Sequence, residues 1–184
     1  MDPYISSEYE LIPFGVDSNL FRPIPKHTAR EQIGWPINEQ IVLFPYSPTR
    51  PLKNYELAKR VVSSLSQEVT LKSLGDIPHD EMPLYMNACD TVLITSIRES
   101  GPLTVKEAAL CNTPIVTTNV GFTADTLSEV SNSYVCDSID SLVDRLEATL
   151  CSDGETDGRE QLIEDVGLER MGDRILHIYN QLLE

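Results

Sequence analysis

From Gln40 onward, short apolar segments rich in β-branched residues alternate with longer segments in which apolar positions recur at helical spacing. Short apolar runs bounded by polar residues are typical of buried strands, and the amphipathic segments between them are typical of helices that cover a sheet. Strands are expected at residues 41–46, 69–75, 91–95, 114–120 and 133–136. This alternation predicts an α/β fold: a Rossmann-like, open, mainly parallel sheet with helices on both faces.

The segments between the strands predict the helices. They lie at residues 54–65, 79–88, 103–111, 124–129 and 138–150. Pro83 stands near the start of the second helix, and Ser138 is a good N-cap for the last. The polar residues 151–159, which include two glycines, are expected to form a loop, and a final helix is expected over 169–183.

The N-terminal part has a less regular pattern than the rest. It predicts a strand-like segment at residues 11–13, a turn at 15–17 and a helix around 29–34. A chain of 184 residues is long enough for one domain with a hydrophobic core but short for a two-domain enzyme. We therefore expect one domain over residues 1–184. Its parts are an N-terminal segment with the first helix (1–39), a βα core (40–152) and a C-terminal helical segment (159–184).

The chain is strongly acidic, with 29 Asp and Glu against 14 Lys and Arg and a net charge of −15. This charge argues against sequence-independent binding to phosphate backbones and to anionic membranes, so nucleic acid is not an expected partner. No apolar run approaches the roughly 20 residues of a membrane span, and the N-terminus is polar. We therefore expect a soluble, cytoplasmic protein.

The cysteines show none of the close pairs that zinc sites and redox motifs use. They are Cys89, Cys111, Cys136 and Cys151. We expect all of them to be buried, reduced thiols.

Two glutamates flank the turn that follows the predicted strand at 91–95. Glu99 precedes the turn at residues 100–102, and Glu107 lies about one turn into the next helix. Because helical side chains lean toward the N-terminus, both carboxylates are expected at the carboxyl edge of the sheet, where open parallel sheets bind ligands. The helix N-terminus favours a phosphate there, and paired carboxylates suit a ligand rich in hydroxyls. Spacing alone favours ordinary roles instead, with Glu107 stabilising the helix dipole and Glu99 solvated.

Basic residues are scarce, which makes their positions informative. Arg50 and Lys53 follow the predicted strand at 41–46 and precede the helix at 54–65, at the same carboxyl edge. Arg binds phosphate oxygens in a bidentate manner and Lys acts as a mobile point charge, so the pair suits a diphosphate. The alternative is that both side chains face solvent, although their proline-rich surroundings favour an ordered role.

Several segments resemble those of a known family. They are I-P-F-G-V-D, R-P-L-K-N-Y-E-L-A, I-P-H-D-E-M-P-L-Y-M-N-A-C-D and S-I-R-E-S-G-P-L-T-V-K-E-A-A-L-C-N-T-P-I-V-T-T-N-V-G. In this order they resemble the C-terminal, donor-binding domain of group 1 (family 4 type) retaining glycosyltransferases, which have the GT-B architecture. The E-x7-E motif of that family falls on Glu99 and Glu107. The resemblance covers nearly the whole chain.

The resemblance implies a role for each candidate residue. Glu99 would contact the donor sugar, Glu107 the ribose hydroxyls, and Arg50 with Lys53 the diphosphate, so Glu99, Arg50 and Lys53 are the catalytic candidates. Arg50 precedes Lys53 by three residues, a shorter separation than in many relatives. Gly15 would lie near the hinge at the cleft entrance. The backbone that would cradle the phosphates belongs to Ser100, Gly101, Pro102, Leu103 and Thr104.

The resemblance also implies a reaction and a partner. The reaction is transfer of a sugar from a nucleotide diphosphate donor, expected to be a UDP- or GDP-sugar, to an acceptor hydroxyl with retention at the anomeric carbon. No cofactor and no metal is expected, because the sequence has no carboxylate or histidine cluster with metal-ligand spacing. Relatives carry the acceptor site on an N-terminal domain that is absent here. We expect little or no transfer until such a domain, or a separate subunit, completes the enzyme and brings it to the inner face of the membrane.

Two other classes of protein stay open on the sequence. One is a non-catalytic nucleotide-sugar-binding or interaction domain, and the other is a sugar-nucleotide epimerase-like enzyme, which would need its own acid and base. A dinucleotide-dependent dehydrogenase is disfavoured because G-x-G-x-x-G is missing from the first strand-to-helix turn. The remaining polar candidates are expected to be structural: His79 as a capping or surface residue, Asp90 in a turn or cap, and Asp125 at a helix start.

Overall fold

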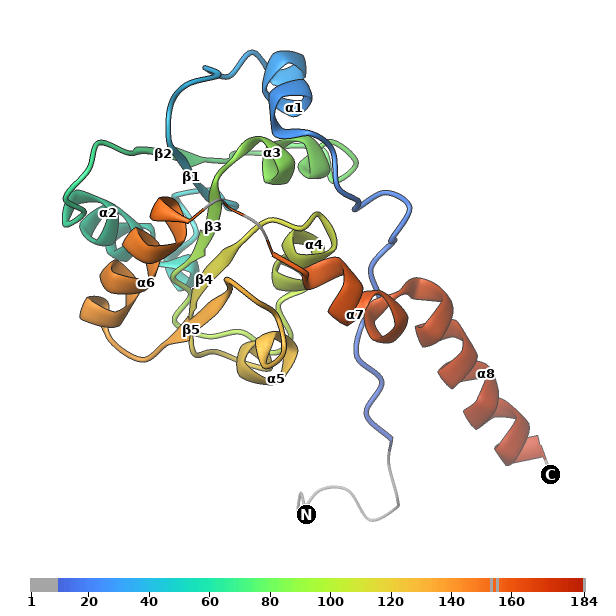
Figure 1. The fold of residues 1–184 in the computed structure, drawn as a ribbon. Helices are drawn as coiled ribbons and strands as arrows, with labels where there is room; N and C mark the ends of the chain where they lie inside the picture. The colour runs from blue at the N-terminus through green and yellow to red at the C-terminus, as the bar shows by residue number, and fades with distance from the viewer. Residues whose placement is uncertain (1–9, 153, 155, 184) are drawn as a thin grey trace.

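The apolar runs of the sequence form a five-stranded sheet in the computed structural model, which describes residues 10–152, 154 and 156–183 (Figure 1). The strands are β1 (Ile41–Phe44), β2 (Thr70–Ser73), β3 (Thr91–Ile94), β4 (Ile115–Thr118) and β5 (Tyr134–Cys136). All neighbouring strands are parallel, in the order β2-β1-β3-β4-β5. Every residue of β1 and β3 is buried, because helices cover both faces of the sheet. The predicted α/β, Rossmann-like fold is confirmed.

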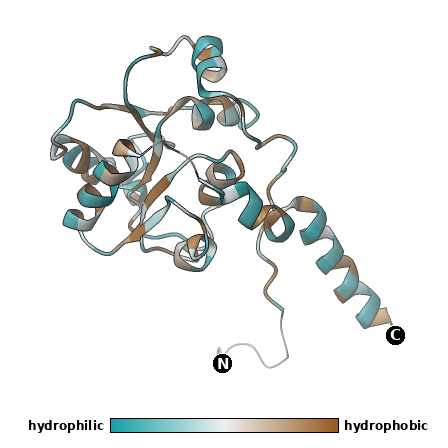
Figure 2. Ribbon diagram, viewed as in Figure 1, coloured by the Kyte–Doolittle hydropathy of each residue, from teal (hydrophilic) through white to brown (hydrophobic). Residues whose placement is uncertain are grey.

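Helices form a layer on each face of the sheet. They are α1 (Lys26–Ile33), α2 (Tyr55–Ser63), α3 (Met82–Ala88), α4 (Leu103–Leu110), α5 (Thr123–Leu127), α6 (Ile139–Cys151), α7 (Gly158–Val166) and α8 (Leu168–Leu183), with a 3₁₀ turn η1 (Pro51–Lys53). Helices α2 and α6 pack together on one face, and α3, α4 and α5 follow one another on the other. Figure 2 shows hydrophobic residues in the strands at the centre and mainly hydrophilic residues along α8.

Local signals at the helix ends agree with the structure. The Ser138 hydroxyl accepts the backbone N–H of Ser141 at the start of α6, and the Ser141 hydroxyl accepts the N–H of Ser138 in return, which completes a capping box. Pro83 lies in the first turn of α3, where the missing N–H of proline has no intrahelical partner to lose. The predicted cap and the predicted helix start are both confirmed.

The two ends of the domain differ from the expectation. Residues 11–13 form no strand, and Val16 pairs with Gly167 of the C-terminal part through one isolated parallel bridge. The expected loop at 151–159 is shorter, because α7 begins at Gly158 and precedes a separate helix α8 that projects from the body (Figure 1). A Cβ on Gly158 would lie 2.8 Å from the carbonyl oxygen of Ala109. The first residue of α7 is therefore a glycine at a point where the helix packs closely on α4.

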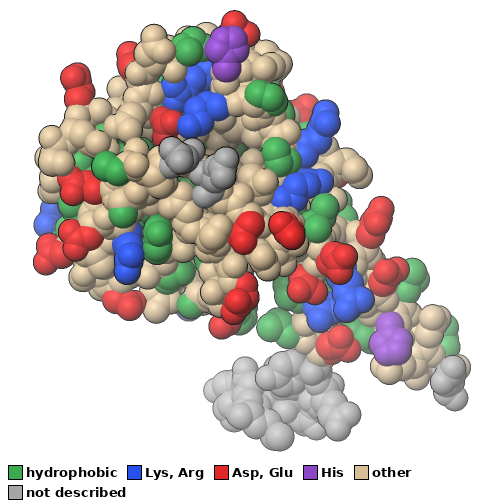
Figure 3. All heavy atoms as spheres, in the orientation of Figure 1, with side chains coloured by type: hydrophobic (Ala, Val, Ile, Leu, Met, Phe, Trp, Pro, Cys, Tyr) green, Lys and Arg blue, Asp and Glu red, His purple; other side chains and the backbone are tan. Residues whose placement is uncertain are grey.

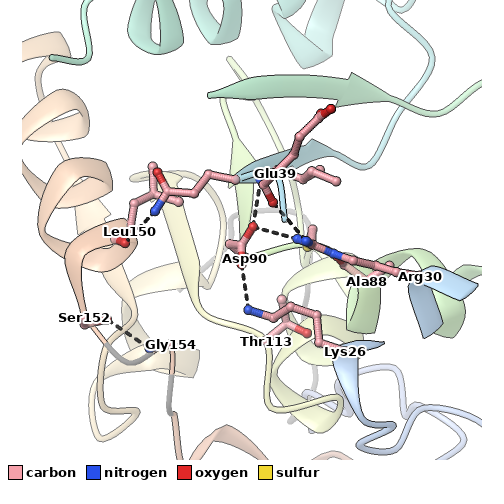
Figure 4. Close-up of polar contacts among 12 residues, drawn as sticks. Lys26, Arg30, Glu39, Ala88, Asp90, Thr113, Leu150, Ser152 and Gly154 are labelled. Atoms are coloured by element: carbon pink, nitrogen blue, oxygen red, sulfur yellow. Dashed lines mark hydrogen bonds and ion pairs between the residues drawn. The ribbon is translucent and has the colours of Figure 1, made fainter. Parts of the chain in front are cut away.

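Asp90 links α1 to the amino ends of β1 and β3 (Figure 4). Its Oδ2 accepts the backbone N–H of Ile41 at 2.7 Å and an N–H of Arg30 at 2.8 Å, while Lys26 Nζ donates to Oδ1 at 2.6 Å. The guanidinium of Arg30 is only 3% exposed and also donates to four backbone carbonyls, those of Ala88, Pro36, Ile37 and Glu39. Asp90 is therefore the anchor of an ion-pair cluster, which goes beyond the expected turn or cap.

We expect Asp90→Asn to lower the free energy of unfolding by about 2–3 kcal/mol, because it leaves the buried Arg30 guanidinium without its counter-charge while keeping the shape of the side chain. Urea denaturation followed by circular dichroism measures the change. Asp144→Asn, at an exposed position of α6, is the matched control and should be neutral. Equal midpoints for the two variants would contradict a stabilising role for the cluster.

The cysteines divide into two environments. Cys89, Cys111 and Cys136 are buried and free, as expected. Burial raises the pKa of all three thiols, that of Cys111 to about 12, so they stay protonated and unreactive. The prediction is wrong for Cys151, which is exposed at the C-terminal end of α6.

Charge is spread over the surface. On the face drawn in Figure 3, acidic side chains are scattered over the body and over the C-terminal helices, with basic side chains in small groups among them.

Within the described part of the chain, every helix is too short or too polar to cross a lipid bilayer.

Candidate functional site

The candidate site lies where the loops after β1 and β3 meet at the carboxyl edge of the sheet. The chain runs from β1 outward to β2 and then returns past β1 to β3, so these two loops diverge at the switch point of the sheet. They are tied together, because the Thr95 hydroxyl donates to the carbonyls of Lys53 and Asn54 at 3.1 and 3.0 Å. The N–H of Ile97 donates to the carbonyl of Leu52 at 2.9 Å. Lys53 is thereby placed beside the loop that carries Glu99.

Lys53 and Glu99 form an ion pair between these loops. Glu99 Oε1 accepts from Lys53 Nζ and from the Ser96 hydroxyl, the latter at 2.7 Å. The side chains are only 12% and 15% exposed, and Lys53 Nζ lies 4.0 Å from the centroid of the Tyr46 ring. The resemblance assigns these two residues to different parts of one ligand, and the structure brings them into direct contact. Glu99 Oε2 accepts no hydrogen bond from any residue that the structure describes.

Helix α4 begins directly after the Glu99 loop. Ser100 and Gly101 are exposed, and Pro102 occupies the N-cap position without any side-chain cap. The N–H groups of the first helical turn have no intrahelical acceptors, so Leu103 and Thr104 present N–H groups at this end. Together with the helix dipole they form a region of positive potential beside Glu99.

Glu107 lies one turn into α4, and its side chain is 7% exposed. Its Oε1 is 2.8 Å from Nε2 of His79, whose ring packs against Phe21 with centroids 5.2 Å apart. Burial raises the pKa of the Glu107 carboxyl, and the contact with His79 opposes that shift. No described residue donates to Glu107 Oε2.

His79 belongs to the candidate site, although a capping or surface role is the sequence-based expectation. It stands in the loop after β2, so it emerges at the same carboxyl edge as Lys53 and Glu99. Position after a strand was the only signal in the sequence, because the partner of His79, Glu107, lies far along the chain on α4. Tyr46 is a second residue that the sequence pattern does not single out, because it closes the apolar run assigned to a strand.

The remaining predicted residues are less closely associated with the pair of carboxylates. Arg50 is exposed, and its side chain has no hydrogen bond or ion pair with any described residue. Gly15 packs against the junction of α7 and α8, where a Cβ would lie 2.9 Å from Leu168 Cα. Its neighbour Phe14 accepts a hydrogen bond from Lys106 Nζ of α4 at 2.8 Å.

A cavity of about 520 Å³ adjoins the turn before α4. Its walls come from the N-terminal segment, the turn, the loop before α5 and α7, and include Phe14, Gly101, Lys106, Phe122 and Val166. Among the described residues, no group of three or more His, Cys, Asp or Glu side chains could hold a metal ion.

Gly121 lies in the loop that follows β4 and packs against the Glu99 loop. Its φ is +56°, and a Cβ there would lie 2.8 Å from the carbonyl oxygen of Ser100 and 3.0 Å from that of Glu99. Gly34 provides a comparison, because its φ is +68° but nothing lies within 4 Å of its Cβ position. Gly121 therefore combines a left-handed backbone with close packing against the site.

We expect Gly121→Ala to lower the free energy of unfolding by about 2–3 kcal/mol, and Gly34→Ala by only about 1 kcal/mol, because both carry backbone strain and only the first carries a clash. Urea denaturation of the two variants gives the difference. If Gly34→Ala were the more destabilising change, the close contact of Gly121 with the Glu99 loop would not be significant for stability.

Comparison with known proteins shows the family of this chain. The model of the family described as "Glycosyl transferases group 1" matches residues 52–165, which is more than half of the chain. This chain therefore belongs to the group 1 glycosyltransferase family. The matched range includes Lys53, Glu99 and Glu107.

Individual relatives are distant. D-inositol 3-phosphate glycosyltransferase of Mycobacterium tuberculosis is 29% identical over 58% of this chain and 28% of its own length. Sucrose-phosphate synthase of Thermosynechococcus elongatus has the same fold, with a TM-score of 0.80 at 21% identity over 95% of this chain and 52% of that one. Anabaena HepE in complex with UDP and glucose has a TM-score of 0.77 at 18% identity, over 91% and 55% of the two chains. This chain thus spans about half the length of these two solved structures.

Proposed function

We propose that this domain binds the nucleotide diphosphate sugar of a retaining glycosyltransferase. One observation carries the proposal: Glu99 and Glu107 stand on either side of the uncapped N-terminus of α4, and each has one oxygen held by the protein and one without a donor among the described residues. The held oxygen orients the carboxylate, and the free one can accept hydrogen bonds from hydroxyl groups. A ligand with hydroxyls at both ends and anionic groups between them fits this arrangement.

Each part of such a donor has a partner in the site. Glu99 would accept hydrogen bonds from the sugar and Glu107 from the ribose diol, while the N-terminus of α4 would hold the diphosphate between them. Lys53, already mostly buried, would share its charge between Glu99 and the diphosphate. Arg50 is exposed and free to turn toward the phosphates. The HepE complex contains UDP, which supports a UDP-sugar as the first donor to test and a GDP-sugar as the second.

The proposed chemistry is mainly electrostatic. The bond between the anomeric carbon and the diphosphate oxygen breaks, and a bond from an acceptor hydroxyl oxygen to the same carbon forms on the same face of the sugar. The proton of the acceptor hydroxyl passes to the leaving diphosphate. Lys53, Arg50 and the α4 N-terminus would stabilise the negative charge that develops on the leaving diphosphate. These positive groups can serve without a divalent cation, so we propose a reaction that needs neither metal nor cofactor.

Isothermal titration calorimetry tests donor binding directly. We expect the wild-type chain to bind at least one of UDP, GDP, UDP-glucose and GDP-mannose. Glu107→Gln should weaken that binding by about ten-fold or more, because it removes a charged acceptor of ribose hydroxyls while keeping the shape of the side chain.

Glu129→Gln is the matched control, since Glu129 is exposed in the loop between α5 and β5 at the opposite edge of the sheet. It should leave the affinity unchanged. Failure of the wild type to bind any of the four compounds would refute donor binding by this domain. Equal affinity of wild type and Glu107→Gln would refute the role of Glu107 alone.

We further propose that a second domain supplies the acceptor site, because the two solved relatives described above are about twice as long as this chain. That domain, rather than this one, would bring the enzyme to the cytoplasmic face of a membrane. We expect the 184-residue chain to bind donor without forming a glycosylated product. Incubation with radiolabelled donor and a panel of hydroxyl acceptors measures transfer, and appreciable product would contradict the proposal.

A further inference from the structure

Tyr46 stands at the centre of the candidate site. It follows β1 by two residues, and its ring is covered by Lys53 Nζ and packs edge-on against Phe44, with centroids 5.5 Å apart. The residue is only 7% exposed. Its ring is therefore held in place from two sides, and its hydroxyl position is determined by the core.

The hydroxyl of Tyr46 is buried and has no hydrogen-bond partner in the described part of the chain. Most buried polar groups in proteins are satisfied, and leaving one unpaired costs about 1–3 kcal/mol. An unpaired hydroxyl on an otherwise well-packed side chain is able to donate its hydrogen bond to a group from outside the protein. The position of the hydroxyl indicates what that group is.

Four polar side chains surround the hydroxyl. The side chains of Thr104 and Ser96 lower its pKa, although the hydroxyl completes no hydrogen bond with either, and the carboxylates of Glu99 and Glu107 raise the pKa. Desolvation by burial is the largest influence and also raises the pKa well above its ordinary value. The phenol consequently keeps its proton at physiological pH and can donate it in a hydrogen bond.

The position of the Tyr46 hydroxyl corresponds to the diphosphate of the proposed donor. In a nucleotide sugar the diphosphate joins the sugar to the ribose, and Glu99 and Glu107 are the proposed partners of those two ends. The Tyr46 hydroxyl is close enough to both carboxylates to be influenced by their charges, and it adjoins Thr104 in the first turn of α4. A ligand that spans the two carboxylates would place its phosphates at this hydroxyl.

We propose that the Tyr46 hydroxyl donates a hydrogen bond to a phosphate oxygen of the bound nucleoside diphosphate. This inference rests on the proposed function. It adds Tyr46, a neutral donor, to the ligand-binding side chains Arg50, Lys53, Glu99 and Glu107. Its hydroxyl remains unpaired in the free protein because its partner belongs to the ligand.

Tyr46→Phe removes the hydroxyl and keeps the ring that packs on Phe44 and Lys53. We expect the thermal unfolding midpoint of the free protein to stay equal or rise, because an unpaired buried hydroxyl is lost. We expect the affinity for the nucleoside diphosphate that wild type binds best, from UDP, GDP and ADP, to fall about ten-fold or more, because a hydrogen bond to a charged group is lost. Affinity for the parent nucleoside, which has no phosphate, should not change.

Tyr134→Phe is the matched control, because Tyr134 is a partly buried tyrosine on β5 that stacks with Arg145 away from α4. It should leave all affinities unchanged. Unchanged diphosphate affinity in Tyr46→Phe would overturn the assignment and leave the proposed function intact. A lower unfolding midpoint for Tyr46→Phe would overturn it as well, since the hydroxyl would then be satisfied within the protein. Absence of binding to every diphosphate by wild type would overturn the proposed function, and the Tyr46 assignment with it.

Discussion

The parallel pairing of β1 with β3 at the centre of the sheet is the constraint on which the rest of the structure depends. Both strands are buried on both faces, so their backbone groups must be paired and the chain must leave each strand at the same edge. The loop that carries Lys53 and the loop that carries Glu99 therefore emerge side by side. Thr95 then joins them by donating to the backbone of the first loop. At the opposite edge, Asp90 and the buried guanidinium of Arg30 secure the amino ends of the same two strands.

The site concentrates charge in a chain with a large negative excess. Two carboxylates within one site repel each other and lose hydration on burial. For each carboxylate a neighbouring side chain offsets this cost: Lys53 for Glu99 and His79 for Glu107. The N-terminus of α4 adds positive potential between them. Such an arrangement stabilises the carboxylates without saturating them, because only one oxygen of each is engaged.

Much of the fold and part of the site could be predicted from local pattern. The periods of apolar residues located all the strands and most of the helices, because burial on a sheet and on one helical face selects those periods directly. Glu99, Glu107 and Lys53 could be predicted to share one edge, since each follows a strand or opens a helix. Helix α7 was expected only as part of a C-terminal helical segment, and its start at Gly158, which packs closely on α4, was assigned to a loop. The exposure of Cys151 at the end of α6 could not be predicted either, because it depends on the packing around that end of the helix.

The amino-acid sequence by itself determined the α/β class, the order of its elements and the residue types available at the ends of the strands, since these follow from local spacing. Only the tertiary structure decided which of those residues meet. The pairing of Lys53 with Glu99 and the contact of His79 with Glu107 each join segments that are far apart in the chain, and the burial of the unpaired Tyr46 hydroxyl depends on the same packing. Contacts of this kind depend on strand order and helix packing, which no local spacing encodes.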